Sequence, residues 1–363
     1  MSRFVVNLLK RDFSVPLAAP QLTYEPASFS WRTMGGCHQS SIAASGYEGD
    51  IWQLMNWLRA PIVIRDSYGQ SVWWGFINEV QIKFPGMTVG ASLEGMANRM
   101  LVIYTEESSG SSQAYRTAWA SDATSVAVYG TIELIASQSH SDATRAAAAL
   151  ATLLAQRRYP LPKVEFARAS GRAEPATATI TCLGWWHSLR FQYYLNSADA
   201  HVEATTQIAA IVAASGQFLT GTQIDDTAGL TPSERRDGRS SALTEVENLL
   251  AGGTINNRRL NAEVLVSRLL RVWEEPLPVT ATTYFLHPDG TVYYPFDYPL
   301  LKYVSPVGKW VRIKDMLPGS VSLHYLADPT LAFVDEAEYS VGEDALRLTM
   351  RDVSRSYNVG GLE

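Results

Sequence analysis

The chain has 363 residues, a formal net charge of −6 and 46% hydrophobic residues. This length exceeds one ordinary hydrophobic core and predicts two or three packed units. The negative charge argues against a nucleic-acid-binding protein held by phosphate contacts, and no apolar run approaches the roughly 20 residues that span a bilayer. We therefore expect a folded protein with no membrane anchor and no specific nucleic-acid binding.

The N-terminal residues indicate where the protein is synthesised, and the cysteines indicate whether it has disulfides or a metal site. Arg11 and Asp12 interrupt the short apolar run near the N-terminus, so we expect no signal peptide and synthesis in the cytoplasm. Cys37 and Cys182 supply neither a disulfide framework nor a set of four metal ligands, and two buried thiols are the expected outcome.

Residues 1–112 predict a small β-rich domain that carries one helix. Alternating apolar residues indicate strands at 4–9 and 24–34. Residues 50–61 have an aspartate cap, an apolar face and a closing proline, which are typical of a short helix. The segment 106–113 has the serine and glycine content of a loop or linker, and we place a domain boundary there.

Within this domain the clearest strand signal is a hairpin over residues 62–80, which turns near Gly69. Nearly every residue of its second strand is bulky. Trp73 and Trp74 point to opposite faces, so neither face is suited to water. One face can cover the domain's own core. The other face is expected to be covered by helices, by a ligand or by a neighbouring subunit. For either tryptophan alone, an ordinary two-layer core explains the residue equally well.

The next range, residues 113–197, is expected to form the strand-helix-strand part of the chain's second half. Alternation indicates the strands, while a polar cap and closing prolines indicate the helix. The expected elements are a strand over 126–137, a helix that begins at Ser141 or Asp142 and ends before Pro160, and a strand over 176–194 that contains Trp185 and Trp186.

Residues 198–252 predict a helical insertion whose two helices stop at Gly216 and Gly252, with an exposed loop near 220–240 between them. Residues 253–363 are β-rich again. The segment 258–275 fits either a helix or strands, and its alternation favours strands. The HPDG sequence at 287–290 predicts a turn, and residues 341–344 predict a second turn between two strands. The expected fold class is α+β, predominantly β.

Several of these stretches, in order and spacing, resemble the tail hub proteins of tailed bacteriophages and related prophages, also called baseplate hub or tail-tip hub proteins. They are FSWRTMGG, GYEGDIWQLMNWLRAPIVIRDSYGQSVWWGFINEV, the helix before Pro160, ITCLGWW and FVDEAEYSVGEDALRLTMRD. The similarity covers most of the chain apart from the loop near 220–240. It implies two tail-tube-like β barrels with packed helices: one within residues 1–112, and one completed by residues 253–363, which also supply an accessory domain.

The resemblance also implies a role and a set of partners. Proteins of this family are structural subunits of the virion tail. They form a trimeric ring that continues the tail tube, joins it to the tip or spike and surrounds the DNA channel. The implied partners are further copies of the chain, a tail tube or distal tail protein, tip, spike or fibre proteins, and a tape measure protein.

The charge balance adds an expectation about the channel. A basic lumen would hold duplex DNA and slow its passage, so we expect a neutral or negative channel surface. The short basic clusters lie beside turns or helix ends, which indicates peripheral contacts. They are Arg157 with Arg158, Arg235 with Arg236, and Arg258 with Arg259.

An enzyme is the first alternative, with a cell-wall hydrolase as its concrete form. The six histidines are isolated in the sequence, and the motifs of zinc proteases, serine hydrolases and nucleotide-binding loops are absent. Adjacent acidic residues usually diverge, so we expect the three carboxylate pairs to lie on solvated loops. These pairs are Glu106 with Glu107, Asp225 with Asp226, and Glu274 with Glu275. We expect no enzyme, and we assign no catalytic, cofactor-binding or metal-binding residue.

A carbohydrate-binding protein that recognises a receptor at the tail tip is the second alternative. Ten tryptophans and 17 tyrosines could line a platform for sugars. They are spread along the chain instead of being gathered in one loop, which favours roles in cores and interfaces.

Overall fold

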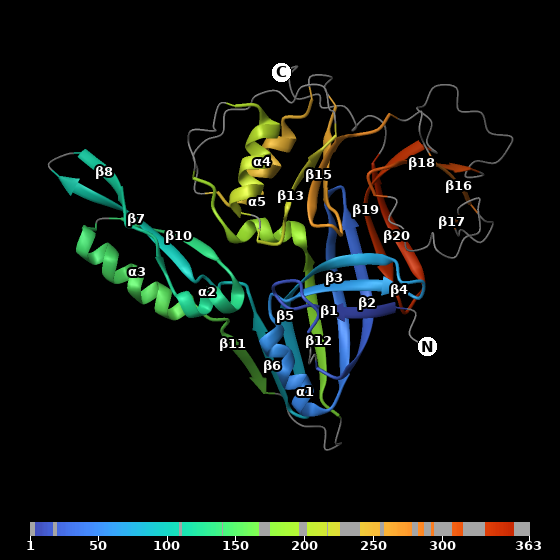
Figure 1. The fold of residues 1–363 in the computed structure, drawn as a ribbon, viewed down its shortest axis with the longest axis horizontal. Coiled ribbons are helices and arrows are strands. Elements are labelled where there is room, and N and C mark those ends of the chain that lie inside the picture. The colour runs from blue at the N-terminus through green and yellow to red at the C-terminus, as the bar shows by residue number, and fades with distance from the viewer. Residues whose placement is uncertain are drawn as a thin grey trace.

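The chain is an α+β protein in which strands predominate, as the sequence predicts (Figure 1). The structure is a computed structural model. It describes residues 4–16, 20–108, 111–139, 141–166, 175–195, 202–215, 217–225, 240–254, 258–277, 282–286, 292–293, 307–314 and 331–351. Among these residues no helix is long and apolar enough to cross a membrane.

A 16-stranded sheet forms the body of the molecule (Figure 1). Along its main path the strands are β1 (Phe4–Leu8), β4 (Pro61–Asp66), β5 (Ser71–Phe84), β12 (Thr177–Gly184), β3 (Met34–Gly46), β2 (Leu22–Arg32), β19 (Leu331–Ser340), β18 (Trp310–Lys314), β16 (Thr282–Leu286) and β17 (Val292–Tyr293). Off this path lie β6 (Met87–Ser92), β11 (Pro162–Phe166), β13 (Gly221–Ile224), β14 (Leu260–Val264), β15 (Leu269–Glu274) and β20 (Ala345–Arg351).

The sheet curls back on itself. Strand β1 stands at one end of the strand order and is separated from β2 by four other strands. The ring of Phe4 on β1 nevertheless lies 5.3 Å from the ring of Phe29 on β2 and 6.1 Å from that of Tyr339 on β19. The three aromatic rings therefore close a hydrophobic core inside the curl. The pair of tube-like barrels implied by the resemblance stays a prediction.

Strands from distant parts of the sequence complete this sheet. Strand β12 pairs antiparallel with both β3 and β5, and β19 pairs antiparallel with β2. Strands from the expected ranges 113–197 and 253–363 thus share one sheet with strands from 1–112. The division into four ranges remains a prediction, and the pairing adds that the ranges are joined by backbone hydrogen bonds.

A smaller four-stranded sheet projects from the body beside α3 (Ala143–Arg157) (Figure 1). Its strands are β10 (Glu133–Gln138), β7 (Arg99–Ser108), β8 (Ser111–Arg116) and β9 (Ala120–Ser121). A separate hydrophobic cluster, which includes Met100, Val102 and Leu150, holds α3 on this sheet. The helix starts as expected, because the Asp142 side chain accepts a hydrogen bond from the backbone N–H of Arg145.

Two expectations for this smaller unit need correction. The segment 106–113 is expected to be a loop or linker, but its described residues, 106–108 and 111–113, belong to β7 and β8, which pair with Glu106 opposite Gln113. The domain boundary expected there stays a prediction. Residues 126–129 belong to α2 (Ala123–Tyr129) and not to a strand, while β10 follows only at Glu133. The Asp122 side chain caps the start of α2 at Ser125 N, and Gly130, with φ of 68°, ends it.

The helices of the body also differ in part from expectation. The first is α1 (Glu48–Gln53), followed by the 3-10 helix η1 (Leu54–Trp57). Tyr47, and not Asp50, stands at the N-cap position of α1. The strand expected over 176–194 ends at Gly184, where the 3-10 helix η2 (Trp185–Phe191) begins.

The remaining helices agree with expectation. They are α4 (Ala204–Ser215) and α5 (Ala242–Ala251), and Gly252 is the C-cap residue of α5. Gly216 and most of the loop near 220–240 lie outside the described residues.

The C-terminal strand expectations are confirmed where the structure describes them. Residues 258–275 contain β14 and β15, which form an antiparallel pair. Strands β19 and β20 pair around the turn at 341–344. Strands β16 and β17 are also paired, although the HPDG turn between them lies outside the described residues.

The chain's own residues cover both faces of β5 near its tryptophans. Trp73 is fully buried and donates a hydrogen bond to the backbone oxygen of Ser30 at 3.2 Å. On the opposite face, Trp74 donates to the backbone oxygen of Val264 at 2.7 Å, and the Phe76 ring packs 5.2 Å from the Phe218 ring. The Phe76 ring also lies 5.7 Å from the Phe191 ring of η2, the 3-10 helix at which β12 ends. Of the three coverings expected for this second face, the structure therefore has the first in part, because a 3-10 helix, strand β14 and the segment that contains Phe218 cover it together.

Two glycines let the backbone of β12 approach its neighbours closely. A Cβ atom on Gly75 would collide with the backbone oxygen of Leu183, and one on Gly184 would collide with the backbone oxygen of Cys37. Gly75 also accepts a hydrogen bond from the indole of Trp185 at 2.6 Å. Side chains at these two positions would therefore push β12 away from β5 and β3.

We expect Gly75→Ala to destabilise the protein by about 3 kcal/mol, because overpacking against the fixed backbone of β12 must be relieved by moving a strand. Thermal or urea unfolding measures the change. Gly342→Ala is the matched control, since a Cβ there meets nothing within 4 Å. Equal stability of the two variants would contradict the role assigned to Gly75.

Candidate assembly surface

Apolar side chains form a continuous strip across the projecting end of the large sheet. We call Trp52, Phe84, Met87, Val164 and Phe166 the apolar strip. Phe166 stands opposite Met87, and Met87 stands opposite Phe84, in adjacent antiparallel pairs. Directly opposed residues share one face of a sheet. The Trp52 ring of α1 stacks on the Phe84 ring at 5.0 Å and extends the strip onto the helix.

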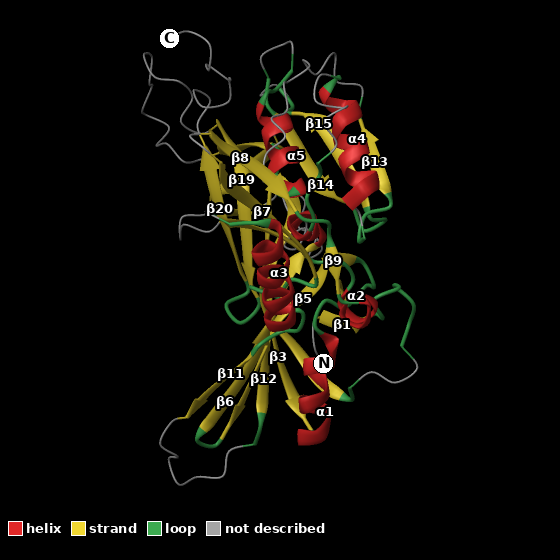
Figure 2. Cartoon of the chain, turned by 90° about the vertical axis from the view of Figure 1, so that its left-hand side faces the viewer, coloured by secondary structure: helices red, strands yellow, loops and turns green. Residues whose placement is uncertain are grey.

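Strand β11 forms the outer edge of this strip (Figure 2). Among the described strands it pairs with β6 alone, so its other edge keeps unpaired backbone N–H and C=O groups. Phe166 is 82% exposed and Val164 is 48% exposed. Monomeric proteins rarely leave an edge strand both unpaired and apolar, and such features mark interaction sites.

The local sequence explains how β11 reaches this position. Pro160 and Pro162 follow α3 and prevent the helix from continuing. In the five residues PKVEF, Pro162, Val164 and Phe166 alternate with Lys163 and Glu165. Alternation places the apolar residues on one face and the charged residues on the other. This pattern was the signal for the strip, and the sequence prediction missed it because it treated the segment only as the end of a helix.

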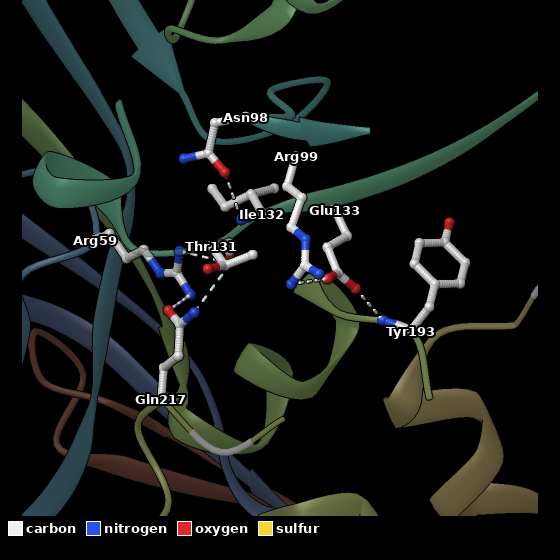
Figure 3. Close-up of polar contacts among 8 residues, drawn as sticks. All are labelled: Arg59, Asn98, Arg99, Thr131, Ile132, Glu133, Tyr193 and Gln217. Carbon is white, nitrogen blue, oxygen red and sulfur yellow. Dashed lines mark hydrogen bonds and ion pairs between the residues drawn. The ribbon is translucent and has the colours of Figure 1, made fainter. Parts of the chain in front are cut away.

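Polar contacts gather at the junction of the smaller sheet and the body (Figure 3). Some lie within the smaller unit, while Glu133 with Tyr193 and Arg59 with Thr131 join it to the body. The buried Asn98 accepts a hydrogen bond from Ile132 N at 2.7 Å and donates to the Gly130 oxygen at 2.8 Å. Beyond it, Glu133 accepts from Tyr193 N at 2.7 Å and lies 3.2 Å from Arg99. Burial raises the pKa of Glu133. The junction is fully bonded at these positions, which indicates a structural role.

Two histidines that are isolated in the sequence lie together in the structure. His38 Nδ1 on β3 and His187 Nε2 on η2 are 2.9 Å apart. Burial lowers the pKa of His187 to about 3, with further lowering from His38 and Arg190. The two histidines are isolated in the sequence, as expected, and the fold brings them together across a separation of 149 residues. No group of three or more metal-ligating side chains occurs among the described residues.

The neighbouring Cys37 does not join the histidine pair. It is buried, and its sulfur accepts a hydrogen bond from the backbone N–H of Trp74 at 3.4 Å. Burial raises the pKa of its thiol, and it does the same for Cys182. Both cysteines are the buried free thiols that the sequence predicts.

We expect the histidine pair to make the fold sensitive to acid. Because the pKa of His187 is lower in the folded protein than its ordinary value of 6.5, the unfolded chain binds this proton more tightly. Stability is then complete above about pH 6.5 and declines as the pH falls toward 3, by about 2 kcal/mol at pH 5.

Thermal unfolding at pH 7.5 and pH 5 measures this effect, and His187→Gln should reduce the difference between the two conditions. An unchanged pH dependence in the variant would contradict the assignment to His187.

The carboxylate pair Glu274 and Glu275 is not solvated, which corrects the expectation. Glu275 is 3% exposed and forms an ion pair with the buried Arg351. Glu274 binds Arg258 at 2.5 Å and accepts a hydrogen bond from Thr254 at 2.7 Å. The two carboxylates point to different arginines, so they do not converge on a shared cleft.

The other carboxylate pairs are described in part. Asp225 binds Arg271 at 2.7 Å, while Asp226 lies outside the described residues. Glu106 and Glu107 are residues of β7. The absence of an enzyme activity stays a prediction.

The basic clusters make contacts where they are described. Arg158 pairs with Asp122 at 2.9 Å and Arg258 pairs with Glu274, whereas Arg235 and Arg236 lie outside the described residues. The charge of any channel surface stays a prediction.

Seven of the ten tryptophans belong to the core or pack against it. Trp31, Trp73, Trp185, Trp186 and Trp310 are buried, and Trp57 and Trp74 are partly buried against the same core. Among the described residues Trp52, in the apolar strip, is the exposed one, at 40%. Sugar-binding platforms present aromatic faces to solvent. This distribution favours packing and interface roles for the tryptophans.

Comparisons with known proteins find a likeness among solved structures. No protein family model matches the chain, and no curated protein matches its sequence. Among solved structures, the chain is similar to the tail protein from Neisseria meningitidis MC58, with a TM-score of 0.42 and 7% sequence identity, over 98% of each chain.

Proposed function

We propose that this chain is a structural protein of a bacteriophage tail and that it works by self-association. The apolar strip carries the proposal. It combines an unpaired strand edge at β11 with exposed apolar side chains, and association with another subunit would bury both. The sequence stretches that resemble tail hub proteins, in order and spacing, are the reason for proposing a phage tail as the assembly.

The finer proposal is a tail hub at the tip or baseplate. Copies of the chain would form a closed trimeric ring, since closure removes exposed sheet edges that would otherwise recruit further chains. The ring would join the tail tube, or a distal tail protein, to tip, spike or fibre proteins, and a tape measure protein would contact it. It would surround the DNA channel of the virion tail. This role is structural, so we propose no catalytic step and no cofactor.

We expect Phe166→Ser to weaken self-association. Burying a phenylalanine side chain contributes about 2 kcal/mol, which corresponds to roughly a thirtyfold change in the dissociation constant for each contact. Native mass spectrometry or light scattering across a concentration series measures the assembly, and a threefold species is expected for the unmodified chain, alone or with the tail tube protein.

Tyr68→Ser is the matched control. Tyr68 is 67% exposed in the turn between β4 and β5, at the end of β5 away from Phe84. Association should be unchanged in this variant. A chain that stays monomeric at high concentration, forms a strict dimer or forms open fibres would refute the ring.

We expect the assembled ring to bind duplex DNA weakly and without a steep dependence on salt, because a neutral or negative channel repels phosphates. Filter binding or fluorescence anisotropy with a DNA duplex at several salt concentrations measures this. Tight binding that weakens sharply with added salt would point to a basic channel and overturn this part of the proposal.

A further inference from the structure

A basic groove lies between the body and α2, at the junction of Figure 3. Its volume is about 610 Å³. The loop after β1 contributes Lys10 and Arg11, and the segment after η1 contributes Arg59. Asp12 supplies the one carboxylate of the described lining. The basic groove therefore carries a net positive charge on a chain whose total charge is −6.

Arg59 has hydrogen bonds in this groove but no carboxylate partner. Its side chain is 2% exposed. Nη1 donates to the backbone oxygens of Tyr129 and Thr131, and Nη2 donates to Gln217 Oε1 at 2.6 Å. All three acceptors are neutral. Among the described residues none forms an ion pair with Arg59, and its buried Nε has no hydrogen-bond partner.

A buried cation without a counter-charge is costly to the fold. Removing a guanidinium from water costs several kcal/mol, which neutral acceptors repay only in part. Burial, and then the charge of Arg11, lowers the pKa of Arg59 to about 9. The Phe191 and Phe218 rings, 4.7 and 5.4 Å from the guanidinium carbon, contribute cation–π contacts but no negative charge.

The charged residues near Arg59 do not form an ion pair with it among the described residues. Arg11 Nη2 donates to the backbone oxygens of Asn56 and Leu58, at 2.7 and 2.8 Å, and so also binds neutral groups. The Asp12 carboxylate accepts hydrogen bonds from the backbone and the hydroxyl of Ser14. It is thus directed to its own loop. A negative group from outside the chain would meet a positive field, because the single acid of the described lining offsets only part of the charge of Lys10, Arg11 and Arg59.

We propose that the basic groove binds an acidic peptide segment of a partner protein, with a carboxylate placed against Arg11 in the positive field of the buried Arg59. Arg11 Nε and Nη2 donate to backbone oxygens of residues 56 and 58, so Nη1 is the nitrogen of this guanidinium that faces the carboxylate. Trp57, Tyr129 and Phe218 also line the groove, and they offer apolar contact to the residues beside the acid. This site lies outside the apolar strip, and the proposal does not depend on the tail assignment.

Fluorescence anisotropy with labelled poly-L-glutamate tests the proposal on the full chain at neutral pH. Binding should saturate in about 50 mM salt and weaken at about 500 mM, since part of the attraction is screened. Arg11→Gln should weaken binding by about tenfold, the factor of a charge-assisted hydrogen bond, and circular dichroism checks that the variant is folded. Lys163→Gln is the matched control, because it removes the same charge from the exposed strand β11 and should bind as the unmodified chain does.

Arg59→Gln adds a second test, because it removes the buried charge and keeps a polar side chain. Weaker binding by a folded Arg59→Gln protein would support the proposal, and Arg11→Gln decides the case if the Arg59→Gln protein does not fold. Equal binding by Arg11→Gln and the unmodified chain would overturn it. So would equal losses in Arg11→Gln and Lys163→Gln, full competition by inorganic phosphate at matched concentration, or equally tight binding of a DNA oligonucleotide, because these results would indicate general attraction of anions.

Discussion

The close approach of β12 to β3 and β5 is the contact on which the rest of the structure depends. Gly75 and Gly184 permit it, and the indole of Trp185 fixes it by donating to the Gly75 oxygen. Once β12 is in place, η2 continues directly from it and brings Trp185 and Trp186 onto the sheet. The helices α4 and α5 then belong to the same hydrophobic core as β5. The two glycines thereby determine where Trp185 and Trp186 lie in the core.

The two ends of strand β5 in the large sheet differ in what covers their bulky side chains. Near Trp73 and Trp74 both faces are covered by the chain itself, and the side chains find partners within the core. Toward Phe84 the same strand reaches the projecting end, where β6 and β11 continue the sheet and the apolar strip is exposed. Internal packing therefore accounts for the bulky residues of β5 at one end. Association with another subunit is the proposed reason for the exposed residues at the other.

Local signals predicted the elements whose ends are set by nearby residues. The Asp142 cap and the following prolines identified α3, and alternation identified β19 and β20 around their turn. The same signals failed where two local preferences competed. Residues 126–129 favour a strand by composition, yet the Asp122 cap and Gly130 make them the end of α2. The histidine pair, the ion pair of Glu275 and the neighbours of Arg59 arise from contacts between distant segments, which no local pattern contains.

The insertion of β12 between β3 and β5 also governs the order in which the chain can fold during synthesis. When a ribosome has made residues 1–112, β3 and β5 exist but the strand that joins them does not, and β2 still lacks β19. These edges remain open until residue 184, and in the case of β2 until residue 340, has left the ribosome. Contacts of such long sequence separation form slowly, and unpaired edges promote aggregation in the meantime. The nascent chain therefore exposes unpaired strand edges for a long part of its synthesis. During that interval, aggregation with other unfolded chains competes with folding.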